Sequence, residues 1–292
     1  MNPAIRAKLA ALGNDISPPM LQGTTALLAT LAPPHNPAVE VTRDQQYGPN
    51  ERNRLDVFRL GAAVRAPVLV YVHGGGFVMG DKTSPGSPFY DNIGQWAAQQ
   101  GCVGVTLTYR LAPAHRWPCG PQDLALAVQW LRAHIGRFGG DPEQILLMGQ
   151  SAGATHVAGY VSQSRFHRNG SPDIAGAVLM SGIYDPTTQP TSPLSIAYYG
   201  EDAAVLREAR TIPGLLATSV PLLFTVSELD PKDFQDQAMQ LAQAWHAHKG
   251  NYPPMEYLAG HNHLSPAQTI GSAEPQMAQR LTDFIAAVCQ AG

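Results

Sequence analysis

The sequence is poor in cysteine, and this limits the kinds of fold and site that it can support. Only three cysteines occur in 292 residues, Cys102, Cys119 and Cys289, and no two of them have the C-x-x-C spacing. An odd, widely spaced set builds neither a disulfide framework nor a zinc site. No H-E-x-x-H motif occurs either. We therefore expect reduced thiols, as in the cytoplasm, and no metal or organic cofactor.

Long hydrophobic runs and a strong net charge are also lacking. No stretch approaches the roughly 18 apolar residues that a membrane span needs, and no apolar run follows a basic start as in a secretory signal. The formal net charge is −3, which gives no reason to expect nucleic acid or an anionic membrane as a partner. Apolar residues make up 44% of the chain, an ordinary share for a folded domain.

Buried strands alternate with helices through most of the chain. Before them, residues 38–42 and 55–60 alternate apolar and polar positions and predict a hairpin. Continuous apolar segments, the mark of strands covered on both faces, occur at 68–72, 103–107, 145–148, 174–180 and 222–226. Helical segments occur at about 88–100, 121–137, 152–164 and 232–249, and residues 255–258 and 275–288 predict a last strand and a closing helix. The pattern predicts an α/β fold with a doubly wound, mostly parallel sheet.

Two segments do not fit this alternation. Residues 3–12 and 19–32 read as short helices that precede any strand. The interval from about 186 to 218 is rich in Pro, Ser and Thr, and such insertions often cover a site. We predict one α/β domain over residues 1–292, with a helical cap from about 1–35 and about 186–218. Tyr198 and Tyr199 in the second segment are candidate pocket-wall residues.

The strongest chemical motif is Gly149-Gln150-Ser151-Ala152-Gly153. It follows the apolar strand at 145–148 and precedes a helical segment. A strand that turns into a helix through G-x-S-x-G exposes the serine at a sharp turn, and the outer glycines allow that turn. Ser151 is therefore the predicted nucleophile.

A serine nucleophile needs a base and an orienting acid, which in this architecture follow it in the order acid, then histidine. Asp230 comes just after the strand at 222–226, with Glu228 as the competing acid. After the last strand stand His261 and His263. We prefer Asp230 and His263, because His263 lies at the far end of its loop; His261 is the alternative base.

A glycine triplet follows the strand at 68–72, in the order His73-Gly74-Gly75-Gly76-Phe77. Consecutive glycines can turn their backbone N–H groups inward without side chains in the way. Donors of this kind stabilise the oxyanion of acyl transfer, and upstream of a G-x-S-x-G the triplet matches the H-G-G-G oxyanion pattern.

Taken together, the chain resembles the hormone-sensitive-lipase-like branch of the α/β-hydrolase carboxylesterases. The matching residues are the glycine triplet, Tyr109 to Pro113, Asp123, Phe138 to Pro142, the serine motif, Asp230-Pro231 and His263. The resemblance implies an eight-stranded sheet, a Ser151-His263-Asp230 triad, and oxyanion donors at Gly75, Gly76 and Ala152. It makes His73 a support of the glycine loop. Candidate substrate-pocket residues are Phe77, Met79, Gln150, Tyr198 and Tyr199.

The sequence departs from that branch beside the nucleophile. Gln150 stands where an acid is usual, and Ala154 where a glycine is usual. Leu264-Ser265 after the base, with Tyr47-Gly48 upstream, is similar to the neighbouring arylformamidase and small-esterase branch. The resemblance implies a serine carboxylesterase for short-chain or aryl esters, with a small-molecule ester as its partner. An amidohydrolase using the same triad is the alternative, a non-catalytic ligand-binding receptor a more remote one. The last strand and closing helix offer an edge for a homodimer.

Overall fold

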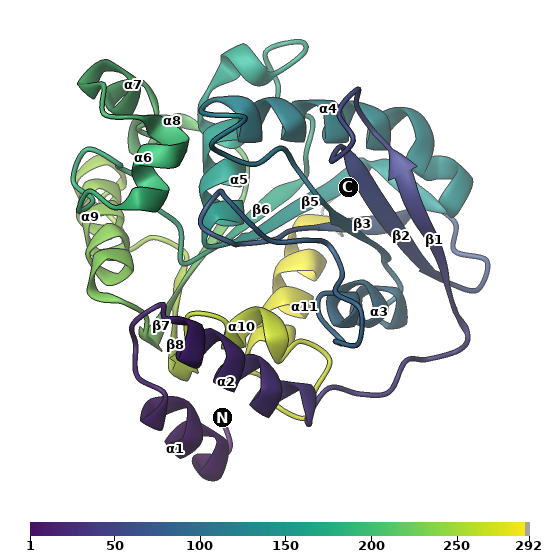
Figure 1. The fold of residues 1–292 in the computed structure, drawn as a ribbon. Coiled ribbons are helices and arrows are strands. Elements are labelled where there is room, and N and C mark those ends of the chain that lie inside the picture. Colours follow the sequence, from purple (N-terminus) through teal and green to yellow (C-terminus); the bar gives the residue numbers. More distant parts are fainter. Residues whose placement is uncertain (290–292) are drawn as a thin grey trace.

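The computed structural model describes residues 1–289, which form one eight-stranded sheet with helices on both faces (Figure 1). The order of strands across the sheet is β1-β2-β4-β3-β5-β6-β7-β8. The β1–β2 and β2–β4 pairs are antiparallel and the other pairs are parallel. The predicted mostly parallel eight-stranded sheet is therefore confirmed. The strands are β1 (Val39–Gln46), β2 (Arg54–Leu60), β3 (Ala66–Val72), β4 (Val103–Leu107), β5 (Gly140–Gln150), β6 (Gly176–Met180), β7 (Leu222–Leu229) and β8 (Met255–Asn262).

The helices alternate with the strands from β3 onward. They are α1 (Pro3–Ala11), α2 (Pro18–Ala29), α3 (Asp91–Gln99), α4 (Cys119–His134), α5 (Ala152–Ser162), α6 (Pro193–Tyr199), α7 (Ala203–Glu208), α8 (Ile212–Ala217), α9 (Lys232–Lys249), α10 (Ser265–Gln268) and α11 (Gln276–Cys289), with short 3-10 turns at Ile135–Phe138 and Ser164–Phe166. Helix α9 begins and ends where the sequence predicts, because Pro231 precedes it and Gly250 ends it with a left-handed φ of 74°. Helices α6, α8 and α10 were not predicted, since each is too short for a helical period to register.

The sheet separates two hydrophobic cores. Alternate residues of a strand point to opposite faces. Val68, Val70 and Val72 of β3 pack with α4, α5, α8 and α9 on one face. Leu69 and Tyr71 pack with α3, α10 and α11 on the other. Figure 1 shows α4 and α5 on one side of the sheet and α3 and α11 on the other. The continuous apolar runs of the sequence are therefore strands covered on both faces.

Strand β8 is longer than the sequence predicts. It runs to Asn262 rather than ending near Leu258, and it continues past a register shift opposite Ser227 and Leu229 of β7. Gly260, with a φ of 81°, lies within this irregular stretch. His263 therefore follows the strand directly instead of lying on a separate long loop.

The two segments outside the alternation lie at the carboxyl ends of the strands. Helix α1 is tied to the end of β7 by Arg6, whose guanidinium lies 2.8 Å from the carboxylate of Glu228. Helix α2 is tied to β8 because Asn262 donates to the hydroxyl of Thr24 over 2.7 Å. In the other segment, Leu194 of α6 covers the glycine triplet, since a Cβ on Gly76 would lie 2.7 Å from its Cδ1. Figure 1 shows α1 and α2 beside β8 and α10, with α6 and α7 on the far side of β7.

Candidate active site

Ser151 occupies a sharp turn between β5 and α5. Its φ of 56° and ψ of −121° are costly for a residue with a Cβ, on the order of 1–3 kcal/mol. The flanking glycines allow this turn because there is no room for side chains. A Cβ on Gly153 would lie 2.1 Å from the carbonyl oxygen of Val72, and one on Gly149 would lie 2.4 Å from the backbone of Gly153. The serine is thus held by backbone packing against the end of β3.

Asp230 and His263 meet at the carboxyl ends of β7 and β8. Nδ1 of His263 lies 2.7 Å from Oδ1 of Asp230, and both side chains are buried. The other carboxylate oxygen accepts from the hydroxyl of Ser181 and the N–H of Ser227, each over 2.7 Å. These donors compensate for the burial of a charged carboxylate.

The hydrogen bond to Asp230 defines the role of each nitrogen of His263. With Nδ1 donating to the carboxylate, Nε2 carries the lone pair. Nε2 is buried and has no hydrogen-bond partner among residues 1–289. The ring also packs on Phe234, at 4.4 Å between centroids. The imidazole is therefore oriented as a base with an unused acceptor.

The competing acid and base have other partners. Glu228 accepts from the N–H of Gly260 over 2.6 Å, and this bond, with Arg6, lowers the pKa of its carboxyl. Nδ1 of His261 lies 3.0 Å from the hydroxyl of Ser265. Burial lowers the pKa of His261 to about 4. Glu228 therefore ties α1 to β8, and His261 is a neutral residue of the core.

The glycine triplet lies directly against the nucleophile. A Cβ on Gly74 would be 3.2 Å from the Cβ of Ser151. His73 supports the loop from beneath: its Nδ1 lies 2.6 Å from the carbonyl oxygen of Gly74, its ring stacks on Tyr109, and burial lowers its pKa to about 4. Within residues 1–289, no hydrogen bond is donated by the N–H groups of Gly75, Gly76 or Ala152. These three donors are available for an oxyanion.

The five predicted pocket residues do not share one environment. Phe77 stacks on Tyr198 at 4.3 Å between ring centroids, and Tyr199 packs against both rings. These three side chains are buried together in one hydrophobic cluster. Met79 is 58% exposed, whereas Gln150 is 1% exposed. Of the five, Met79 is the side chain that meets solvent.

Two residues near the site were not singled out from the sequence. Ser181 holds Asp230, and Leu194 covers Gly76. Ser181 follows β6 directly, so a polar residue after a buried strand was a usable signal. Leu194 lies in the insertion, where the sequence contains no periodic pattern that places it.

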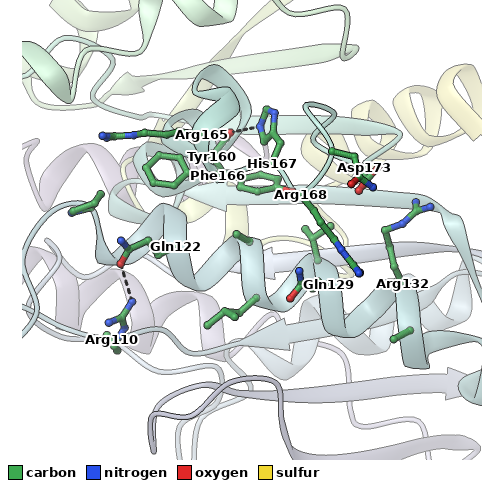
Figure 2. Close-up of a pocket in the computed structure, with 16 residues that line it drawn as sticks. Arg110, Gln122, Gln129, Arg132, Tyr160, Arg165, Phe166, His167, Arg168 and Asp173 are labelled. Carbon is green, nitrogen blue, oxygen red and sulfur yellow. Dashed lines mark hydrogen bonds between the residues drawn. The ribbon is translucent and has the colours of Figure 1, made fainter.

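A cavity also lies away from this site, on the α4 side of the molecule. It has a volume of about 940 Å³, and its walls come from α4, the end of α5 and the segment 165–173 (Figure 2). At the ~1.5 Å rise per residue of a helix, Tyr160 in its wall lies about 13 Å along α5 from Ser151. Most of its arginines already have acidic partners. The pairs are Arg110–Asp123, Arg132–Glu143 and Arg165–Glu208.

Among residues 1–289, no set of three or more His, Cys, Asp or Glu side chains is placed to bind a metal ion. In the same part of the chain, none of the helices combines the length and the apolar character that crossing a membrane requires.

A serine at a strained strand-to-helix turn of a mostly parallel sheet, with an acid and a histidine directly after later strands, defines the α/β-hydrolase class. A family model described as alpha/beta hydrolase fold matches residues 69–265. The chain belongs to this family, as its resemblance implied.

Several relatives of the chain are esterases. The chain is 29% identical to esterase LipQ of Mycobacterium tuberculosis over 209 residues, which cover 68% of this chain and 48% of LipQ. It is 27% identical to versiconal hemiacetal acetate esterase of Dothistroma septosporum, over 82% of this chain and 69% of that enzyme. The chain thus spans about half the length of LipQ. Among solved structures, an esterase of Pyrobaculum calidifontis has a TM-score of 0.71 at 21% identity, with 100% of this chain and 99% of that chain covered.

Proposed function

We propose that the protein is a serine carboxylesterase that hydrolyses short-chain or aryl esters. The observation that carries the proposal is the buried Asp230–His263 pair, 2.7 Å apart, at the sheet edge where Ser151 occupies its strained turn. The names of the relatives support an ester as the small-molecule substrate. Ser151 is the proposed nucleophile, His263 the base and Asp230 the group that orients it.

In the first half of the proposed reaction, Oγ of Ser151 attacks the ester carbonyl carbon while Nε2 of His263 takes its proton. The tetrahedral intermediate collapses, the bond to the alcohol oxygen breaks, and the alcohol leaves with the proton from His263. Water then attacks the acyl-enzyme in the same way, and the carboxylic acid leaves. Asp230 keeps Nδ1 protonated and stabilises the imidazolium that forms in each half.

The proposed oxyanion site consists of the N–H groups of Gly75, Gly76 and Ala152. Their lack of partners in the described chain supports this role, as does the packing of Gly74 against Ser151. Removing one such donor typically costs on the order of 10²–10³ in rate. Because His73 is buried and neutral at pH 7, it supports the loop without adding a charge.

The cap is proposed to come from about residues 1–35 and 186–218 of a single domain. Leu194 lies over Gly76, and Met79, three residues after it in the chain, has an exposed side chain, so we expect these apolar side chains to meet the acyl or alcohol group. Ser151 is only 8% exposed, which supports small substrates. We expect a preference for acyl chains of about two to six carbons, because each methylene that a pocket accommodates contributes to discrimination.

The test is a panel of p-nitrophenyl acetate, butyrate, hexanoate and laurate, with N-formylkynurenine as the amide substrate. The wild type should turn over the short esters fastest, and Ser151→Ala should abolish turnover. Ser162→Ala, at the far end of the same helix, is the matched control and should keep full activity. Faster turnover of laurate than of butyrate would contradict the chain-length preference. Faster turnover of the formamide would replace the esterase with an amidohydrolase.

A further inference from the structure

Gln150 is the residue beside the nucleophile whose side chain also contacts the base. It ends β5, is 1% exposed, and donates from Nε2 to the carbonyl oxygen of His263 over 2.7 Å. Its Oε1 lies against the glycine loop, since a Cβ on Gly74 would be 2.6 Å from that oxygen. One buried amide therefore touches both the chain that carries the base and the loop that carries the oxyanion donors.

The hydrogen bond from Gln150 to His263 joins the carboxyl ends of two strands that are not neighbours in the sheet. Strands β6 and β7 lie between β5 and β8, so the ends of β5 and β8 are about 14 Å apart at ~4.8 Å per strand spacing. The chain after β8 must fold back over the sheet edge to bring His263 toward Ser151. Asp230 holds the ring of His263 through Nδ1, whereas Gln150 holds its backbone. The two contacts fix different parts of the residue.

The chemistry of the contact requires a donor at position 150. A backbone carbonyl oxygen only accepts hydrogen bonds, and an amide NH₂ group supplies the proton. An ionised carboxylate only accepts, so a glutamate of the same shape would place two acceptors face to face. Any other side chain at position 150 that lacks a donor would leave the buried carbonyl group of His263 without this hydrogen bond.

We propose that Gln150 is a positioning residue for His263: its amide holds the backbone of the base in register with Ser151 and the glycine loop. This inference rests on the proposed esterase function, and it replaces the expectation that Gln150 forms part of the substrate-pocket wall. Gln150 does not contact the reacting atoms. Its loss should therefore lower kcat and leave KM nearly unchanged, because substrate contacts stay in place while the proton transfer loses its geometry.

The main experiment compares Gln150→Met, which keeps the length of the side chain but lacks the donor, with Gln95→Met. Gln95 is a buried glutamine of α3 whose side-chain amide has no hydrogen-bond partner within the described residues. With p-nitrophenyl butyrate, Gln150→Met should lose about 10- to 100-fold in kcat, as misplacement of a reacting group by about 1 Å can cost, with KM within about twofold. Gln95→Met should match the wild type. An unchanged kcat in Gln150→Met would overturn the inference.

Two further measurements separate this inference from the proposed function. A protonated carboxyl can still donate to the carbonyl oxygen, so Gln150→Glu should lose kcat only as the pH rises and its carboxyl ionises; a kcat equal to that of the wild type up to pH 9 would show that donation is not needed and would overturn the inference. The low-field proton resonance of His263 Nδ1–H reports the ring directly by NMR, without any substrate. It should shift or broaden in Gln150→Met and stay unchanged in Gln95→Met. If the wild type hydrolysed no ester, the proposed function would fail, whereas this resonance would still decide whether Gln150 orders His263.

Discussion

The two halves of the candidate site are held in different ways. The nucleophile elbow at the end of β5 is built from adjacent residues, and its shape depends on backbone packed against backbone: Gly153 against Val72, and Gly149 against Gly153. The base at the end of β8 is held by side chains that come from far away in the sequence. Asp230 is 33 positions from His263 and Gln150 is 113 positions away.

The difference shows which changes each half should tolerate. The packed backbone leaves no space at the elbow, so a side chain added to either glycine should overlap other atoms and destabilise the fold. The side chains that hold the base can be replaced by others of similar size without overlap. Such replacements should misorient His263 and lower activity while the fold persists.

The largest effect is expected on the base side. Asp230→Asn keeps the size of the side chain but favours the wrong tautomer of His263, and kcat for p-nitrophenyl butyrate should fall by about 10⁴. Glu228→Gln is the matched control, because Glu228 bonds to Gly260 and Arg6 and not to His263. Its kcat should stay near the wild-type value. Equal losses in the two variants would mean that the acid is wrongly assigned.

A smaller effect, on stability, is expected at the elbow. Gly153→Ala would place a Cβ 2.1 Å from the carbonyl oxygen of Val72, and overpacking of this kind should lower the free energy of unfolding by about 3 kcal/mol. Gly136→Ala is the control, since a Cβ there meets nothing within 4 Å. Urea unfolding followed by circular dichroism measures both variants. If Gly153→Ala were as stable as Gly136→Ala, the contrast between the halves would not hold.

The smallest expected effect is on the pH dependence of the free energy of unfolding, through His261 on the base side of the site. Burial lowers the pKa of His261 from 6.5 to about 4, so the unfolded chain binds more protons than the folded one between these values. The contribution of His261 to stability is then complete above about pH 6.5 and is lost as the pH falls toward 4. His261→Gln should reduce the loss of unfolding free energy between pH 7 and pH 4.5 by on the order of 1–2 kcal/mol. Urea titrations at both pH values measure this slope, and an identical slope in the variant would rule out a neutral buried His261.

Much of the architecture could be predicted from the sequence. The strands at 68–72 and 103–107 and the helix at 232–249 were predicted within a few residues, because apolar runs, Pro231 and Gly250 act locally. The extension of β8 to Asn262 could not be predicted, since it depends on an irregular pairing with β7. Helices α6, α8 and α10 escaped prediction because they are short and are stabilised by packing on other elements.

The candidate site divides in the same way. In the structure Asp230 contacts His263, which is the pair preferred from the sequence. Glu228 and His261 form hydrogen bonds with other residues instead. The position of Ser181 directly after a buried strand was a usable signal for its contact with Asp230, but no pattern in the sequence indicated that Gln150 reaches His263. Phe77, Tyr198 and Tyr199 stay predictions as pocket residues, and only the tertiary structure showed that their rings pack on one another.

The sequence alone determined the order of strands and helices along the chain. It also determined the serine at a strand-to-helix turn, and the glycine triplet with a later acid and histidine. These features depend on neighbours in the chain: a glycine allows a turn and an apolar run forms a buried strand wherever it lies. Only the tertiary structure decided which acid meets which histidine and how Gln150 bridges the base and the glycine loop. Those contacts join residues brought together by sheet order and register, which no local pattern encodes.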